Sequence, residues 1–432
     1  MLKKLGLLHV GPAPEMSLEL SPRLNLITGD NGLGKTFLLV AAWWALTRSW
    51  ASEPATPDRS THQNSSIEWT TSILSEDSPV EKEIGSHSSF DTATNDWSYK
   101  GQPASHLALY SLADGSFASY EPVKALTPGS FGAMQATRPA LPFFKFSPRQ
   151  LLDGLKDPST GTMVCEGLIA HLNQWSLRRS KEYDHFISVL EALSPPDLPL
   201  TLGAPLKISL DDDRDYPTIR MPYGQDVPIV HVSAGVRRIV SLAYLLVWTW
   251  HSHQRAAKLV QRPPIREVVF LVDEMETHLH PQWQRRIVPA LLNVVKSMTG
   301  QSDIRAQLIA TTHSPLILAS VEPEFDEEQD ALFHLKLREG GGVALDKMPW
   351  AKQGDASHWL VSDAFGLRQA RSVQAEEAIS AANAWMRGER EGFPPGLDDA
   401  EAIHQELLKV LPDLDPFWPR WIVRREKSGG AA

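Results

Sequence analysis

The sequence predicts an α/β fold, and three apolar stretches support this prediction. Residues 23–27 form an apolar run that enters a glycine-rich turn and continues as an apolar helical pattern over residues 37–50. Residues 268–272 and 308–310 are continuous apolar runs that end in polar or charged residues. Such runs are typical of strands that are buried on both faces inside a parallel sheet.

The length and charge of the chain limit its organisation and its partners. At 432 residues, it is long enough for two or three domains and a substantial core. The formal net charge is -10 and the isoelectric point is near 5.8, so no global basic field attracts nucleic acid. Contact with DNA therefore requires a local basic patch or a partner.

Cysteine content and hydropathy favour a cytoplasmic protein. Cys165 is the single cysteine, which excludes an internal disulfide framework and fits a reducing compartment. Residues 1–16 carry two lysines, but their short apolar run is broken by glycine and proline, unlike a signal peptide. No run of about 18 apolar residues is present, so we expect no membrane span.

The glycine-rich turn has the spacing of a phosphate-binding loop, GxxxxGK[ST]. Glycines let backbone N–H groups converge on phosphate oxygens, the lysine brings a positive charge to the β and γ phosphates, and the threonine hydroxyl can ligate Mg²⁺. The strand before the turn and the helix after it are the setting that this loop requires. The residues expected to bind a nucleotide here are Gly29, Asn31, Gly32, Gly34, Lys35 and Thr36.

The next segment is expected to form two inserted lobes. Residues 51–147 alternate short apolar runs with polar loops, which predicts a β-rich lobe of short strands, with a hairpin turn at Asp114 and Gly115. Residues 148–193 have a helical pattern that a proline-rich stretch ends, and a polar segment leads back to residue 224. The sequence contains no internal repeat and no heptad array.

The acidic end of the second apolar strand indicates catalytic chemistry. Asp273 and Glu274 follow residues 268–272 directly. An acidic residue at the carboxyl end of such a strand is where phosphate-loop ATPases usually hold Mg²⁺. We therefore expect Asp273 to join Thr36 as a metal ligand, and Glu274 to orient and deprotonate the attacking water.

His313 follows the third apolar strand, at residues 308–310. A histidine at this position can hydrogen-bond a γ-phosphate or the nucleophilic water and so distinguish ATP from ADP. Taken alone, a histidine at a strand end is a structural residue. After a phosphate loop and an acidic strand end, we expect it to be catalytic.

A long apolar helix is expected over residues 236–250, after the stretch VHVSAG. Ser233 has the chemistry of an N-cap, and with Ala234 and Gly235 it leaves backbone N–H groups open to an anion at the positive end of the helix. Within one subunit this is ordinary helix capping. At this point the chain resembles the ABC-type ATPase superfamily, whose Ser-x-Gly signature contacts the γ-phosphate held by the opposite subunit.

The resemblance covers residues 1–50 and 225–320, with four motifs in the family's order. NGLGKT, SAGVRR, DEMETHLHP and ATTHSP are similar to the soluble branch: SMC and RecF-like proteins, OLD-family nucleases, and the ATPases of anti-phage systems such as Septu and PARIS. Transporter subunits commonly show LSGGQ and SALD, where this chain has VSAGV and METHL. The prolines between phosphate loop and signature, without heptads, favour a compact lobe over a coiled coil.

The resemblance implies a fold and a domain plan. The fold is a P-loop ABC-type ATPase head with a mixed β-sheet, whose two halves are residues 1–50 and 225–345. The lobe between them is compact. Residues 346–432 form a C-terminal extension that is mainly helical, and a strand pair around residues 332–348 precedes it.

The resemblance also implies ATP and Mg²⁺ as cofactors and a head-to-head homodimer or higher oligomer. ATP then lies between Lys35 and Thr36 of one subunit and Ser233 and Gly235 of the other, and its hydrolysis opens the dimer. The family's Q-loop glutamine lies between phosphate loop and signature, and Gln150 is the candidate.

Three polar groups have two interpretations each. Arg237 and Arg238 either approach the phosphate of the opposite subunit or hold their helix to acidic neighbours. The second interpretation is favoured. His278 and His280 have the spacing of a two-ligand metal site, but a structural role is favoured, and the resemblance places them in the D-loop at the dimer seam. The acidic run at residues 211–215 suggests a two-metal nuclease; a solvated loop is favoured, because no toprim-like pattern follows the head.

Two further stretches are candidate contact surfaces. DPFWPRW, at residues 415–421, is either a folded-back staple, which is favoured, or a docking patch for a partner. Arg178, Arg179 and Lys181 are the best local basic patch for DNA, although a solvated helix face is favoured.

We therefore expect an ATPase whose ATP-dependent dimerisation regulates a partner effector, most plausibly a nuclease in anti-phage defence. One alternative is a RecF-like repair or chromosome-maintenance ATPase that binds DNA directly. Another is an oligomeric scaffold that ATP stabilises and that hydrolyses little of it. A transporter motor ranks behind these.

Overall fold

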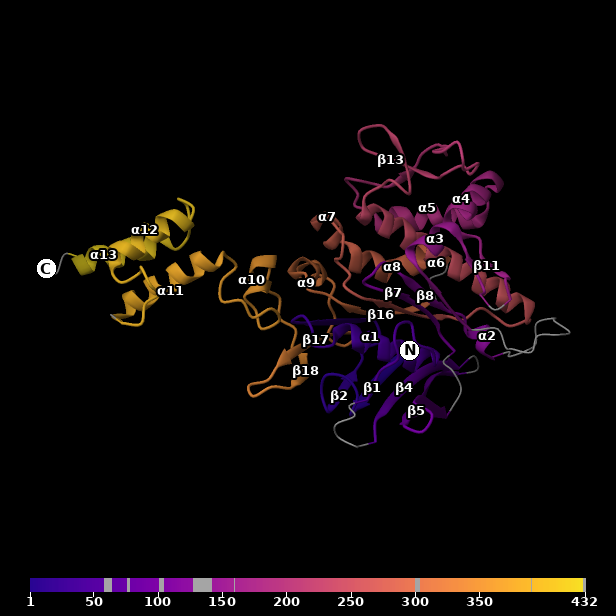
Figure 1. Ribbon diagram of the computed structural model, residues 1–432, viewed down its shortest axis with the longest axis horizontal. Helices are drawn as coiled ribbons and strands as arrows, with labels where there is room; N and C mark the ends of the chain where they lie inside the picture. The colour runs from indigo at the N-terminus through magenta and orange to yellow at the C-terminus, as the bar shows by residue number, and fades with distance from the viewer. Residues whose placement is uncertain are drawn as a thin grey trace. The chain divides into compact units, whose positions relative to one another are not determined.

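An eight-stranded mixed β-sheet lies at the centre of the fold, in the strand order β18-β17-β3-β16-β15-β7-β8-β9 (Figure 1). Its five neighbouring strands from β17 to β7 are parallel, whereas β18 and β8 pair antiparallel at the two sides. The predicted mixed sheet is therefore confirmed. The bounds are β3 (Leu24–Gly29), β7 (Leu107–Ser111), β8 (Phe117–Tyr120), β9 (Phe143–Phe146), β15 (Glu267–Val272), β16 (Arg305–Thr311), β17 (Asp330–Leu337) and β18 (Val343–Met348).

The computed structural model describes residues 1–57, 64–75, 78–100, 105–126, 142–158, 160–299, 304–389 and 391–429. The chain divides into two units, Met1–Gly354 and Asp355–Ala432. This boundary lies later than the expected residue 346, because β18 pairs with β17 and so belongs to the first unit.

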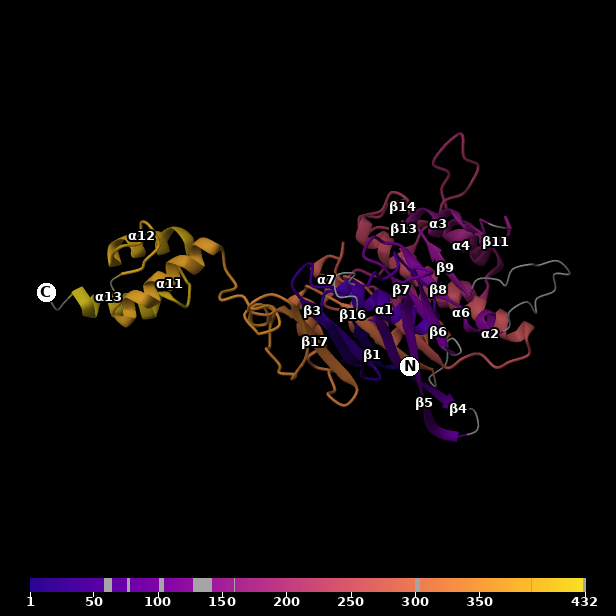
Figure 2. The same ribbon diagram turned by 60° about the horizontal axis from the view of Figure 1, so that its bottom comes forward.

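A second, antiparallel sheet has the strand order β2-β1-β4-β5-β6. Helix α1 (Lys35–Thr47) contacts strands of both sheets and is buried along almost its whole length, so it lies between them. Figure 2 shows the β4–β5 hairpin reaching past the neighbouring strands. The bounds are β1 (Leu2–Leu8), β2 (Glu15–Glu19), β4 (Ser66–Ser75), β5 (Ser78–Asp91) and β6 (Asp96–Lys100).

Residues 51–147 do not form the separate β-rich lobe that was expected. Their strands β4, β5 and β6 extend the sheet that β1 begins, and β7, β8 and β9 complete the central sheet. β4 and β5 have 10 and 14 residues, so they are not short strands. The hairpin at Asp114 and Gly115 is confirmed, because it joins the antiparallel strands β7 and β8. Residues 127–141 lie outside the described residues.

Helices cover the face of the central sheet opposite α1 (Figure 1). Alternate residues of a strand point to opposite faces. In β15, Val269 and Leu271 pack with α1 in one core cluster, whereas Val268 and Phe270, equally buried, point to the other face. On that side lie α5 (Lys181–Leu193), α6 (Ala234–Leu259) and α8 (Ile287–Thr299), which pack against one another.

The helical prediction for residues 148–193 is confirmed by α3 (Pro148–Asp153), α4 (Gly167–Arg178) and α5, which the short strands β10 (Leu155–Lys156) and β11 (Met163–Cys165) interrupt. Helix α6 begins close to the expected residue 236 but extends beyond residue 250. The other elements of this unit are α2 (Pro122–Leu126), β12 (Thr201–Leu202), β13 (Thr218–Arg220), β14 (Asp226–Pro228), α7 (Pro281–Gln284) and α9 (Pro315–Val321). No described helix is both long enough and apolar enough to cross a membrane.

The second unit is a small helical bundle with its own core. It contains α10 (Ala356–Leu360), α11 (Val373–Arg387), α12 (Ala400–Val410) and α13 (Trp418–Gly429). Trp418 and Trp421 are buried in the core that α11, α12 and α13 share. Their indole N–H groups donate to Pro412 O at 2.8 Å and to His404 Nδ1 at 3.1 Å. The aromatic stretch at residues 415–421 is therefore the folded-back staple that was favoured.

We expect Trp421→Ala to loosen this bundle, because removing a fully buried tryptophan costs about 3–5 kcal/mol. Hydrogen exchange over residues 373–429 of the full chain should then show a comparable loss of protection. Ile422→Ala is the control, since Ile422 is 44% exposed and surface changes stay within about 0.5 kcal/mol. Equal protection in the two variants would contradict this account of the core.

Candidate nucleotide-binding site

Three neighbouring parallel strands bring the predicted motifs to one edge of the central sheet. β3, β16 and β15 pair in that order, so their carboxyl ends lie side by side. Residues from the turn after each strand line one cavity of about 540 Å³. The predicted residues among them are Asn31, Gly32, Gly34, Lys35, Thr36, Asp273, Glu274 and His313.

Two glycines permit the backbone path of the phosphate loop. Gly29 has φ 134° and a Cβ there would lie 2.3 Å from the carbonyl oxygen of Leu335 on β17. Gly34 has φ 101° and is the N-cap of α1. Both conformations lie in a region that side chains disfavour. The first glycine thus lets β3 pair closely with β17, and the second lets the loop turn into the helix.

The Lys35 side chain lies inside the glycine-rich loop. Its Nζ donates to the backbone carbonyl oxygens of Gly29 and Asp30, each at 2.7 Å. Burial lowers the pKa of the Lys35 ammonium, and the negative charge of Asp30 opposes this shift. The ammonium is thus directed into the loop, where phosphate oxygens would replace the two carbonyls as its partners.

The Asp273 carboxylate connects α1 to the end of β16. Its carboxylate accepts hydrogen bonds from the hydroxyl of Thr36 at 2.8 Å and from that of Thr311 at 2.7 Å. Burial raises the pKa of Asp273, and these two hydrogen bonds oppose the rise. Mg²⁺ commonly takes one or two protein oxygens beside phosphate oxygens and waters. The Thr36 and Asp273 pair fits that need.

Glu274 is held in an uncommon backbone conformation. Its φ of 46° lies in the left-handed region, which is costly for a residue other than glycine and often marks a functional site. Two hydrogen bonds fix it: Glu274 N donates to Thr311 Oγ1 at 2.8 Å, and Thr277 Oγ1 donates to Glu274 Oε2 at 3.1 Å. The carboxylate therefore lines the cavity from a fixed turn, beside Thr36 and Asp273.

Arg238 supports this turn from helix α6. Its guanidinium donates to the carbonyl oxygens of Asp273 at 3.1 Å, Glu274 at 3.4 Å and Thr277 at 3.3 Å. Burial lowers the pKa of Arg238, and the nearby carboxylates, Glu276 first, oppose this shift. Arg238 thus holds its helix to the acidic turn, which was the favoured interpretation. Arg237 donates to Val232 O at 3.1 Å, within its own helix start.

Glu276 connects the acidic turn to the predicted histidine, and the sequence analysis missed it. Its carboxylate accepts from Thr312 Oγ1 at 2.7 Å and from the backbone N–H of His313. Its position two residues after the Asp-Glu pair could have suggested a role at the site. Its hydrogen-bond donors follow another strand, however, so the sequence alone does not predict these contacts. Glu276 fixes the backbone on which His313 enters the cavity.

The signature residues lie at the start of α6 and do not line this chain's own cavity. Ser233 is exposed and caps the helix, with Oγ accepting from Val236 N at 3.4 Å. A Cβ on Gly235 would lie 2.4 Å from the carbonyl oxygen of His278. Only glycine therefore lets the D-loop-like segment cross the helix start, where backbone N–H groups remain open to an anion from outside.

His278 and His280 take structural positions. His278 supplies the carbonyl against Gly235, and His280 Nδ1 accepts from Gln282 N at 3.4 Å as the N-cap of α7. Among the described residues, no group of three or more histidine, cysteine, aspartate or glutamate side chains is arranged to hold a metal.

Gln150 is not brought to the cavity. It is the N3 residue of α3, where Ser147 and Gln150 form a capping box: Gln150 N donates to Ser147 Oγ at 3.3 Å, and Ser147 N donates to Gln150 Oε1 at 3.0 Å. The nucleotide cavity has no contribution from it. The role of Gln150 in this structure is therefore to cap the start of α3.

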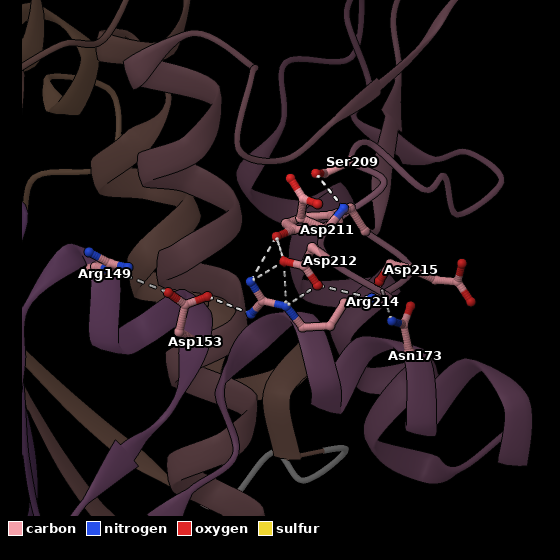
Figure 3. A network of polar contacts seen from close by, with 9 residues as sticks. Arg149, Asp153, Asn173, Ser209, Asp211, Asp212, Arg214 and Asp215 are labelled. Atoms are coloured by element: carbon pink, nitrogen blue, oxygen red, sulfur yellow. Dashed lines mark hydrogen bonds and ion pairs between the residues drawn. The ribbon is translucent and has the colours of Figure 1, made fainter.

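The acidic run at residues 211–215 is an exposed loop held by an arginine (Figure 3). Arg214 points between two carboxylates, donating to Asp212 Oδ2 at 2.7 Å and to Asp153 Oδ1 at 2.8 Å. Neighbouring Asp211 and Asp215 are exposed. The solvated-loop interpretation fits this network, since Arg214 already pairs with Asp212 and the neighbouring aspartates are exposed.

The far wall of the cavity was not predicted. It consists of residues 52–56, with Gly11, Phe37 and Val40 beside them. The indole of Trp97 donates to Ala55 O at 2.9 Å and Val10 bridges to Pro57, so the wall is anchored to the antiparallel sheet. Its sequence offered no signal, because its role depends on contacts with β1 and β6.

This chain is similar to one protein family and to several known proteins. Residues 176–319 match the family described as "AAA domain, putative AbiEii toxin, Type IV TA system". The Septu protein PtuA of Bacillus thuringiensis is 31% identical over 118 residues, which is 26% of either chain. The Retron Vc95 probable ATPase of Vibrio cholerae is 30% identical over 125 residues, 28% of this chain and 21% of its own. The matches thus span about a quarter or less of these relatives.

Among solved structures, the SMC head domain from Thermotoga maritima aligns with 81% of this chain and 99% of its own. The identity is 17% and the TM-score is 0.39.

We expect Gly235→Ala to displace the segment around His278, because the added methyl group would lie 2.4 Å from a carbonyl oxygen. Overpacking of this kind costs about 1–3 kcal/mol, so hydrogen exchange over residues 233–240 and 274–280 should accelerate. Gly85→Ala is the matched control, since nothing lies within 4 Å of its Cβ position. Unchanged exchange in Gly235→Ala would contradict the close approach.

Proposed function

We propose that this chain, an ABC-type ATPase related to the ATPases of anti-phage defence systems, hydrolyses ATP between two paired heads and thereby controls a partner effector. The observation that carries the proposal is the convergence of Lys35, Thr36, Asp273, Glu274 and His313 on one cavity. Each follows the carboxyl end of a parallel strand, either in the turn or at the start of α1, and each has the chemistry that one part of the reaction requires.

Different residues have different roles in phosphoryl transfer to water. Backbone N–H groups of the loop and the Lys35 ammonium bind the β and γ phosphates. Thr36 and Asp273 would hold Mg²⁺, which supplies charge neutralisation when bound. Glu274 takes the proton of the attacking water, and His313 donates a hydrogen bond to the γ-phosphate. Nearly all of this is positioning and electrostatics, so the fixed turn around Glu274 is central to the rate.

The exposed start of α6 supports pairing of heads. Ser233 and Ala234 are exposed, and α6 is 26 residues long, so the positive end of its dipole faces solvent. In a head-to-head dimer this end meets the γ-phosphate bound by the partner subunit. Pairing is then strongest with ATP, and hydrolysis weakens it.

The relatives support the biological role that we propose. Two of them are named as a Septu protein and a retron ATPase, so we place this chain in anti-phage defence. The partner is an effector, for which a nuclease is our choice. Among the described residues no metal cluster that would serve a nuclease is present in this chain.

Steady-state ATP turnover over a protein concentration series tests the proposal. We expect turnover that rises faster than linearly with protein concentration, because each active site needs two heads. Glu274→Gln should lower kcat by at least about 100-fold while ATP binding persists. Linear turnover would contradict pairing, and full turnover in Glu274→Gln would contradict the role of this carboxylate.

Glu276→Ala tests the support of His313 separately. It leaves the Thr312 hydroxyl and the His313 N–H without their acceptor, a cost of about 1–3 kcal/mol. We expect kcat to fall about tenfold with little change in KM, because the phosphate loop still binds the nucleotide. Glu276→Gln keeps one acceptor oxygen, so its kcat should lie between that of the wild type and that of Glu276→Ala. A higher KM at unchanged kcat would show that Glu276 serves binding instead.

A further inference from the structure

The last helix of the second unit has a cationic outer face. Arg420, Arg424 and Lys427 are exposed and stand at positions i, i+4 and i+7 of α13, which lie on one face of a helix. The inner face carries the buried Trp421, and Arg425 pairs with Glu401. The helix thus uses one side for the core, and its outer side carries three exposed cations.

These cations line a hollow of about 470 Å³ on the second unit. Its remaining lining residues are Met386, Pro419 and Val423, so no acidic residue is among the described residues that line the hollow. Within the described part of the chain, neither Arg420 nor Lys427 forms an ion pair. In a chain of net charge -10, such a concentration of positive charge is a local exception.

Helix stability alone does not explain the position of Arg420. A cation in the last turn of a helix is stabilised by the helix dipole, and Lys427 stands there. Arg420 stands in the first turn of α13, where the dipole opposes a positive charge. An anionic ligand bound beside Arg420 would offset this unfavourable interaction with the helix dipole.

We propose that this face of α13 binds the phosphate backbone of duplex DNA. Guanidinium groups form bidentate hydrogen bonds with phosphate oxygens, and two of the three cations are arginines. At 1.5 Å per residue, Arg420 and Lys427 are about 10 Å apart along the helix, which equals about three steps along one DNA strand. The three cations can therefore reach phosphates within one short stretch of the duplex backbone.

The composition of the hollow favours duplex over single-stranded nucleic acid. Single-strand binders stack bases on aromatic side chains, and no aromatic residue lines this hollow. Trp418 and Trp421 are turned into the core instead. The contact is thus with the backbone and is independent of sequence. This inference does not depend on the ATPase proposal, because the cavity of the first unit is not involved.

Fluorescence anisotropy with a mixed-sequence duplex of about 30 base pairs tests the inference on the full chain over a salt series. Three phosphate contacts contribute about 2.7 to the slope of log K against log salt. The triple variant Arg420→Gln, Arg424→Gln, Lys427→Gln should lose that slope and bind at least tenfold more weakly at low salt. Its ATP turnover should remain that of the wild type.

Two matched variants keep the test decisive. Arg178→Gln, Arg179→Gln, Lys181→Gln removes the patch that the sequence suggested and should bind DNA like the wild type. Arg420→Lys with Arg424→Lys keeps the charge and should retain most of the slope, and near-ultraviolet circular dichroism checks the fold of each variant. The inference is overturned if the wild type does not bind the duplex, which would leave an acidic protein surface as the ligand, or if removal of the α13 cations changes nothing.

Discussion

The hydrogen bonds to the Asp273 carboxylate are the interactions on which the site depends. Thr36 comes from α1 and Thr311 from the end of β16, and both donate to this one group of β15. The three elements that form the cavity therefore meet at a single buried carboxylate. This meeting is possible because β3, β16 and β15 are parallel neighbours, which places their carboxyl ends at one edge.

A second layer of contacts ties the turn that carries Asp273, Glu274 and Glu276 to helix α6 and to His313. Arg238 donates from α6 to the carbonyls of Asp273 and Glu274, and Glu276 accepts from the residues that carry His313. Gly235 lies against the carbonyl of His278. A displacement at the helix start would thus also displace the turn that carries Glu274 in the same chain. The geometry suits an enzyme in which a partner's nucleotide touches that helix start.

Sequence reasoning succeeded where a motif is local. The phosphate loop, the Asp-Glu strand end and the Ser233 cap are each fixed by neighbours within a few residues, and the apolar runs identified the buried parallel strands. Reasoning failed where the partner is distant in sequence. Residues 51–147 complete two sheets through pairings that no local pattern shows, and Glu276 was missed because Thr312 and His313 come from another strand. Gln150 was predicted to reach the nucleotide, but it does not line the cavity, because its side chain caps the start of α3 together with Ser147.

Complementation between two variants tests the paired-head account most directly. Lys35→Ala removes the phosphate contact in one head, and Ser233→Asp keeps a good helix cap but sets a negative charge against the partner's γ-phosphate. Each variant alone should be inactive. An equal mixture should recover about a quarter of wild-type ATP turnover, because half of the pairs are mixed and each mixed pair has one intact site of two. Turnover no greater than the sum of the separate variants would show that each head works alone.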